Sequence, residues 1–202
     1  VSHRDSLAHQ QQEEAEVEEA AESDMHLKFD LDVTPEATMQ VLMDAKSGDY
    51  INLYGNGRIL ANYYNKGKFQ MYGTYRVDHG LYKLSLQDVI RKDFTFRRDG
   101  TITFGGAPGK AALQLSAVYT VPNVSLEDLS SSSLGLSNTR VDCIMNIGGE
   151  AFTPVVSFDF DLPNANEDEK RMVRSMLSTE EEKNMQVIYL LGIGRFYNQN
   201  AQ

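Results

Sequence analysis

Apolar residues alternate with polar ones along most of this chain, and this period of two limits what the chain can fold into. The alternation begins at Leu27, Phe29 and Leu31 and is still present at Phe158 and Phe160. A period of two sends successive side chains to opposite sides of a strand, so one side can pack on a core while the other meets water. The pattern predicts a protein built mainly from β-strands.

Short polar segments divide this region into separate strands. The expected strands lie near residues 25–33, 39–43, 50–56, 58–64, 68–77, 80–87, 94–96, 102–104, 111–119, 141–147 and 158–160. Turn residues separate them, as in Asn65-Lys66-Gly67 and Val77-Asp78-His79-Gly80, and Arg98-Asp99-Gly100 is typical of a hairpin. Because no helical pattern intervenes, the strands are expected to form an antiparallel meander.

The charge of the chain is concentrated at its beginning. The net charge is −10, and residues 1–24 hold eight Asp and Glu against one Arg, which is −7. The remaining 18 basic and 21 acidic residues give only −3. A nearly balanced folded part lacks the basic surface that phosphate binding needs, so nucleic acid is excluded as a partner. Residues 10–24 are low in complexity and favour a frayed helix or a disordered lead-in.

The last forty residues change to helical spacing. Pro163 ends the final strand, and Ser178-Thr179 followed by three Glu is a capping signal for a second helix. We expect two helices that pack at one end of the sheet through Met172, Val173, Met176, Leu177, Ile188 and Leu191. The predicted organisation is an acidic lead-in over 1–24, a sheet over 25–162 and a helical tail over 163–202.

Groups suited to catalysis or metal binding are scattered. Four histidines show no ligand spacing, and the single cysteine, Cys143, lies in an alternating run typical of a buried, inert thiol. Gly105–Lys110 fails as a phosphate loop because Phe104 and Ala111 replace the required residues. The oxygen-rich segment 159–168 departs from calcium-loop spacing. The sequence therefore predicts no enzyme, no cofactor and no metal.

Several longer stretches carry a family resemblance. They are DVTPEA (32–37), GDYINLYGNGRI (48–59), FQMYGTYRVDHGLYKLSLQDVIRKDFTF (69–96), GTITFGGAP (100–108), ALQLSAVYTV (112–121), RVDCIMNIGG (140–149), TPVVSFDFDLP (153–163) and STEEEKNMQVIYLL (178–191). In this order they resemble the C-terminal conserved region of TamB, the translocation and assembly module protein, in its Bacteroidetes-type form. Ala107 departs from the family, which usually has Asp or Asn before this Pro.

The resemblance implies a fold and a cellular setting. The fold is a mainly β, curved, open antiparallel meander, a trough shaped like a taco shell (β-taco) with an apolar inner face. TamB-like proteins are periplasmic and anchored in the inner membrane through an upstream helix. No apolar run in this chain is long enough for such a helix, and it begins at Val1, so we expect a piece of a larger protein.

Two functions of different classes follow from the resemblance. One is phospholipid transport between the inner and outer membranes, with acyl chains shielded in the trough. The other is a scaffold for assembly of outer-membrane proteins, working with a TamA-type barrel or related lipoprotein by β-augmentation. A third possibility is that the apolar face is simply the core of a closed sandwich.

We expect one apolar face to line the trough. Alternation on successive strands places these residues there, if all strands present the same side: Phe94, Phe96, Ile102, Phe104, Leu113, Leu115, Val141, Cys143, Met145 and Ile147. About ten strands at roughly 4.8 Å each would make a trough about 50 Å across.

Overall fold

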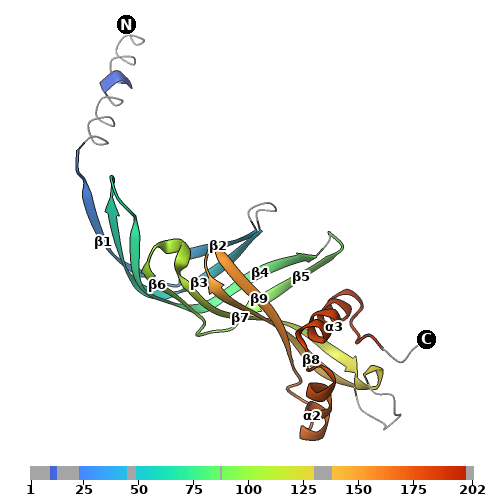
Figure 1. Cartoon of the computed structure of the whole chain (residues 1–202). Coiled ribbons are helices and arrows are strands. Elements are labelled where there is room, and N and C mark those ends of the chain that lie inside the picture. The colour runs from blue at the N-terminus through green and yellow to red at the C-terminus, as the bar shows by residue number, and fades with distance from the viewer. Residues whose placement is uncertain (1–9, 13–22, 45–48, 87, 130–137, 199–202) are drawn as a thin grey trace.

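The computed structural model describes residues 10–12, 23–44, 49–86, 88–129 and 138–198, and most of the predicted lead-in over 1–24 lies outside them. Figure 1 shows one strongly curved sheet followed by helices at the C-terminal end. The elements in chain order are β1 (His26–Val33), β2 (Thr38–Asp44), β3 (Asp49–Tyr64), β4 (Gln70–Leu86), β5 (Ile90–Phe96), β6 (Thr101–Gly106), η1 (Pro108–Lys110), β7 (Ala112–Ser125), η2 (Leu126–Asp128), β8 (Asn138–Glu150), β9 (Thr153–Asp161), α2 (Glu167–Met176) and α3 (Glu180–Ile193).

The nine strands of the described residues form one antiparallel sheet in which most strands pair with the next strand along the chain. The order is β1-β3-β4-β5-β7-β8-β9. β1 and β2 pair with successive halves of β3, and β5 and β6 pair with successive halves of β4, so each of these two pairs of strands fills a single row. The sheet is therefore seven rows wide, about 29 Å at roughly 4.8 Å per spacing. The meander is confirmed, but the expected width of about ten strands is wrong. Four of the predicted strands are halves of β3 and β4, and two rows each hold two strands end to end.

Glycines inside the long strands explain this miscount. Gly55 and Gly57 lie within β3, and Asp78-His79-Gly80 lies within β4, where the pairing register shifts opposite Tyr54 and Gly55. A Cβ at Gly57 would stand 2.7 Å from the carbonyl oxygen of Thr74, so only glycine admits the neighbouring strand there. Glycines and bulges bend a strand without ending it.

The predicted hairpin at Arg98-Asp99-Gly100 is also wrong. The Val77 N–H donates to the Gly100 carbonyl at 2.8 Å, and the Asp99 N–H donates to the Val77 carbonyl at 2.9 Å. These bonds keep the segment between β5 and β6 in line beside β4, so the two strands run end to end and do not pair with each other. Asp99 adopts the left-handed conformation, with φ of 74°.

The register separates an apolar face from a polar one. One row of paired residues across five strands is Val33, Gly57, Tyr75, Ile102 and Leu113. The row one residue away is Asp32, Arg58, Thr74, Thr103 and Ala112. We call the side that carries the first row the apolar face; the sheet's other side carries the charged and hydroxyl groups.

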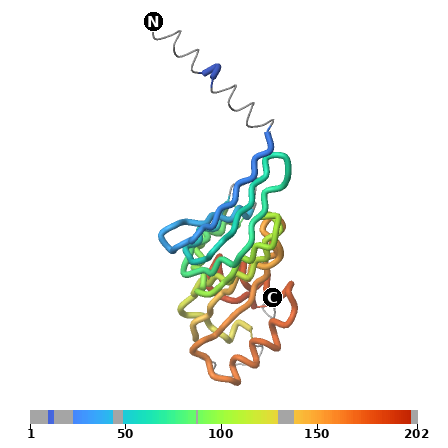
Figure 2. Tube along the Cα trace, turned by 90° about the vertical axis from the view of Figure 1, so that its left-hand side faces the viewer, coloured from blue at the N-terminus to red at the C-terminus, as the bar shows by residue number. Residues whose placement is uncertain are grey.

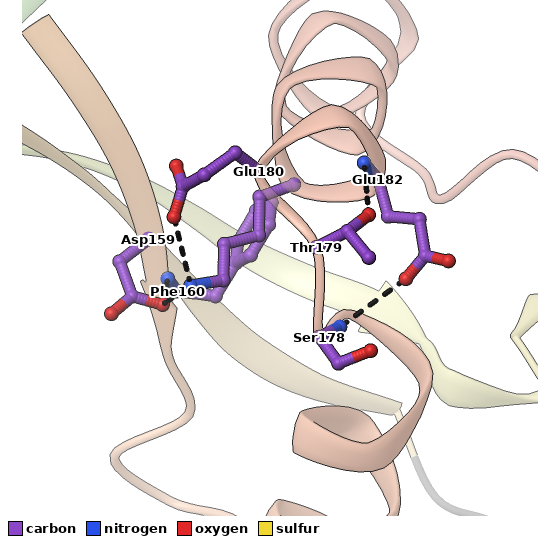
Figure 3. A network of polar contacts seen from close by, with 7 residues as sticks. Asp159, Phe160, Ser178, Thr179, Glu180 and Glu182 are labelled. Carbon is purple, nitrogen blue, oxygen red and sulfur yellow. Dashed lines mark hydrogen bonds and ion pairs between the residues drawn. The ribbon is translucent and has the colours of Figure 1, made fainter.

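Both helices begin with capping interactions. At the start of α2 the Asn166 side chain accepts from the Glu169 N–H at 2.8 Å, and the Glu169 carboxylate accepts from the Asn166 N–H at 3.2 Å. At α3 the Thr179 hydroxyl oxygen accepts from the Glu182 N–H at 3.1 Å, as Figure 3 shows. Lys183 lies 3.6 Å from Glu180 and 3.9 Å from Asp159 of β9, which ties this end of α3 to the sheet. Gly194, in the left-handed conformation, caps the other end.

The helical tail packs on the apolar face, where α3 contacts β5 and β9. Its buried apolar residues are Val173, Leu177, Val187, Leu190, Leu191 and Phe196. Two expected packing residues are instead exposed, Met176 at 36% and Ile188 at 50%. The Phe196 ring meets Phe160 of β9 edge to face with centroids 5.8 Å apart.

Polar contacts fasten the chain beyond α3. The fully buried Gln186 side chain donates to the Tyr197 carbonyl at 3.0 Å and accepts from the Tyr197 N–H at 2.7 Å. Arg195 makes a two-pronged ion pair with Asp128, with N–O distances of 3.2 and 2.9 Å. The end of the tail is thus held at both the helix and the β7–β8 connection.

Candidate functional site: the apolar face and its open section

The ten predicted trough residues all lie on the apolar face. Ile102 stands opposite Leu113, and Leu115 stands opposite Ile147. Nine of the ten are at most 4% exposed, and Phe104 is half-buried. They belong to one cluster of buried residues that also includes Val187 and Leu190 of α3. In this structure most of them form a packed core, which we call the core section of the apolar face.

The apolar face stays accessible at its other end. Leu27, Phe29 and Leu31 of β1 are 41–45% exposed, and Tyr63 of β3 is 37% exposed. They point to the same side as the core section, because Leu31 stands opposite Ile59 and Phe29 opposite Ala61. We call these β1 residues, with Tyr63 and Met71, the open section. Their alternation is visible in the sequence, but no local signal shows which end of the face the tail leaves uncovered.

A cavity of about 560 Å³ lies between the open and core sections. Its described lining is apolar except for Gln40, and consists of Met39, Gln40, Val41, Leu42, Met43, Met71, Ile102, Phe104, Pro108, Leu113, Ala151 and Phe152. Three predicted trough residues therefore reach an accessible space: Ile102, Phe104 and Leu113. The volume falls within the range of small-molecule sites, roughly 300–1,000 Å³.

The cavity joins β2 to the turn between β8 and β9, although these lie at opposite edges of the sheet order. Figures 1 and 2 show how strongly the sheet curves, and residues of both segments line the mouth of this one cavity. Phe152 stands at this mouth and is 85% exposed. Its N–H donates to the Gly109 carbonyl at 2.9 Å, and a Cβ at Gly109 would collide with its ring. Three methionines in the lining are adaptable, because their side chains are unbranched and flexible.

Polar groups enclosed within the apolar face remain neutral. Burial raises the pKa of the Cys143 thiol to about 12, and the nearby charge of Asp142 adds to the effect. Burial, followed by the charge of Asp78, raises the pKa of Tyr75 to about 12. The Tyr75 hydroxyl is buried and has no hydrogen-bond partner within the described structure. The face thus offers an apolar environment without ionised groups at these positions.

We expect Cys143 to be protected from thiol reagents. In the folded chain at pH 8, maleimide should label it at least about a hundredfold more slowly than in the urea-unfolded chain, because the thiol is inaccessible and burial disfavours the reactive thiolate. A Phe29→Cys variant supplies a control thiol on the open section that should label rapidly. Equal labelling rates of Cys143 in the folded and unfolded chains would contradict this placement.

Two negative findings concern the described part of the chain. Among these residues, no group of three or more His, Cys, Asp or Glu is arranged to hold a metal ion. None of the helices that the structure describes is both long enough and apolar enough to cross a membrane.

A curved antiparallel sheet with one apolar and one polar face, partly covered by helices, defines a trough-like class of β-proteins. The family model of the TamB C-terminal domain matches residues 2–202, and the chain belongs to this family. It is therefore part of a TamB-like envelope protein. Searches of curated proteins and of solved structures found no significant match.

Proposed function

We propose that the apolar face shields the acyl chains of phospholipids moving between the inner and outer membranes. The supporting observation is the apolar cavity and its continuity with the open section: Met71 lines the cavity and pairs with Ala61, which pairs with Phe29. A lipid can place its chain along this path while its head group stays in water. The domain acts in the periplasm, and the full-length protein is anchored to the inner membrane outside this chain.

The hydrophobic effect is large enough to hold a lipid without any reacting group. Transferring about 16 methylenes from water at roughly 0.8 kcal/mol each gives about 13 kcal/mol before the costs of ordering. The proposal therefore assigns no catalytic residue. Since the sheet is about 29 Å across and the tail covers one end, this chain supplies one segment of a longer conduit. The core section is filled by its own side chains, so lipid occupies the open section and the cavity.

Lipid retained by the purified 202-residue chain tests the proposal. Mass spectrometry of an organic extract, prepared without detergent, should find phospholipid in the unaltered chain. The double variant Met39→Gln and Met71→Gln keeps side-chain size but adds amides, and each unpaired amide in an apolar site costs roughly 1–3 kcal/mol. We expect its lipid content to fall at least about tenfold.

The matched control is Leu60→Gln, which alters a residue that is 49% exposed on the polar face opposite Asp30 and Tyr72. It should retain as much lipid as the unaltered chain. Absence of lipid from the unaltered chain, or equal lipid in the double variant and this control, would count against acyl-chain binding.

A second candidate function is a scaffold for outer-membrane protein assembly with a TamA-type barrel. The observation that favours it is the outer edge of β9, which pairs with β8 on one side and ends the sheet order. Val155 and Val156 of this strand are 63% and 42% exposed, as suits a strand that receives another strand. Cross-linking from β9 to a barrel, with the cavity variant unimpaired, would favour this function over lipid transport.

A further inference from the structure

A second cavity, of about 440 Å³, lies where β9 meets both helices of the tail. The apolar part of its lining includes Phe160 of β9 with Val173 and Leu177 of α2, which belong to the hydrophobic core or pack against it. None of the residues that line it also lines the apolar cavity beside β2. The two spaces are therefore separate sites.

Three cationic side chains line this cavity: Lys170 and Arg174 of α2, and Lys183 of α3. Lys170 and Arg174 are four residues apart, so they share one face of α2. The Lys170 and Lys183 side chains are only 25% and 22% exposed, an unusual degree of enclosure for lysine. The Arg174 guanidinium makes no ion pair or hydrogen bond with the part of the chain that the structure describes.

The two enclosed ammonium groups also make no hydrogen bond with the described residues. The Lys170 ammonium lies 3.6 Å from Glu167. The Lys183 ammonium lies 3.6 Å from Glu180 and 3.9 Å from Asp159 (Figure 3). These separations exceed the roughly 2.7–3.2 Å of an N–H···O bond. Enclosed positive charges with unused donors favour a ligand that brings anionic oxygens.

Two carboxylates line the same cavity, those of Asp159 and Asp161 in β9. Residues two apart on a strand point to the same side, so these groups are neighbours. Asp159 accepts from the Phe160 N–H through Oδ1 at 2.8 Å, and its Oδ2 accepts no hydrogen bond from the described residues. The lining therefore offers free acceptors beside free donors, with three positive charges and two negative ones.

We propose that this cavity binds a phosphoethanolamine group, the zwitterion in which two carbons join a phosphate to a primary ammonium. The phosphate accepts hydrogen bonds from the three cationic side chains, and the ammonium donates to Asp159 and Asp161. A simple anion would be repelled by the two carboxylates, and a simple cation by the three positive charges. The group occurs both as a lipid head group and as a small soluble ester. Because the cavity is separate from the apolar one, this binding does not depend on whether the apolar face carries lipid.

Nuclear magnetic resonance titration with glycerophosphoethanolamine tests the site in the isotope-labelled 202-residue chain without any acyl chain. We expect saturable shifts of the Leu177 and Ser178 amides, with a Kd on the order of 1 mM, as suits a small polar ligand. Glycerophosphocholine has no ammonium N–H, and inorganic phosphate has no ammonium, so each should bind at least about fivefold more weakly. Equal binding of the three compounds would overturn the assignment of a zwitterion.

Arg174→Gln removes a donor whose loss leaves no partner unpaired among the described residues, so the fold should be unchanged. We expect it to weaken glycerophosphoethanolamine binding at least about fivefold. The matched control is Arg171→Gln on the same helix, because Arg171 is 76% exposed and lies outside the cavity lining. This control should bind as the unaltered chain does. Equal affinities of the two variants would overturn the proposal.

Asp161→Asn tests the ammonium end by a readout that a structural defect would not produce. It should weaken binding of glycerophosphoethanolamine at least about threefold, because the ammonium loses a charged acceptor. The same variant should bind inorganic phosphate more tightly than the unaltered chain, because a repelling carboxylate is gone. Parallel losses for both ligands would overturn the placing of the ammonium beside Asp161.

Dihexanoyl phosphatidylethanolamine, used below the concentration at which it forms micelles, separates the two sources of the group. Binding at least about tenfold tighter than that of glycerophosphoethanolamine would support the site as one for a lipid head group, since the apolar lining then contacts the first carbons of the lipid. Equal binding would support the site as one for the soluble ester. The proposal is overturned if neither compound shifts the Leu177 and Ser178 amides at concentrations on the order of 10 mM.

Discussion

Leu115→Asp is expected to unfold the domain. Leu115 is 3% exposed, stands opposite Ile147 of β8, and belongs to the core section. The substitution removes a buried side chain worth roughly 1.5–3 kcal/mol and introduces a carboxylate whose burial without a partner costs still more. A domain stability of about 5–15 kcal/mol leaves little margin for both effects. Any loss of lipid binding in this variant then follows from the loss of the fold.

The adjacent variant Gln114→Asp is the control, because Gln114 is exposed on the polar face opposite Thr101. Thermal unfolding followed by circular dichroism should show a cooperative transition for Gln114→Asp at nearly the original temperature. Leu115→Asp should show little or no cooperative transition. A transition within a few degrees of the unaltered chain would mean that the core section opens enough to admit water to this position.

A chain that ends at Leu162 is expected to expose apolar surface and to aggregate or bind a hydrophobic dye. It lacks α2 and α3 together with the six buried residues of the tail, among them Leu190 and Phe196 at 1% exposure. Six such side chains bury surface worth on the order of 10 kcal/mol before ordering costs. Phe160 of β9 would also lose the ring that covers it. Dye fluorescence and light scattering measure this directly.

Two point variants test whether stability depends on the buried side chains of the tail and not only on the tail being present. Leu190→Ala removes a buried side chain of α3 and should cost about 2–5 kcal/mol of stability. Ile188→Ala makes a similar deletion at a position that is 50% exposed and should cost less than about 1 kcal/mol. If the shortened chain remains monomeric, silent to dye and as stable as the whole, the tail is a dispensable appendage.

The sequence predicts the two faces of the sheet well because alternation is a local property. The alternation that identifies each strand also places residues such as Phe94, Cys143 and Ile147 on the same face. Strand ends were less predictable, since Gly57 and Gly80 are usual in turns but here admit close neighbours inside long strands. Their role depends on strands that are distant in sequence.

The accessible part of the site was missed for a related reason. Whether an apolar residue is covered depends on curvature and on where the tail packs, and neither is written in a local pattern. Leu113 and Phe29 both lie in alternating runs, yet one is 3% exposed and the other 45%. In the tail, Leu191 and Ile188 both fit a helical stripe, yet Leu191 is buried and Ile188 is 50% exposed. The buried side of α3 is the one that carries Val187, Leu190 and Leu191.

The order of rows in the sheet has a consequence for how the domain is made. Apart from the two interrupted rows, each strand pairs with the strand just before it and the strand just after it, so most strand-to-strand loops are short, the β7–β8 connection being the long one. Short loops lose little entropy on closure, and nearest-neighbour arrays can grow from an existing edge. A chain that emerges amino end first can therefore add each row as it appears. We expect the final helices to close the apolar face last, after every strand they cover is in place.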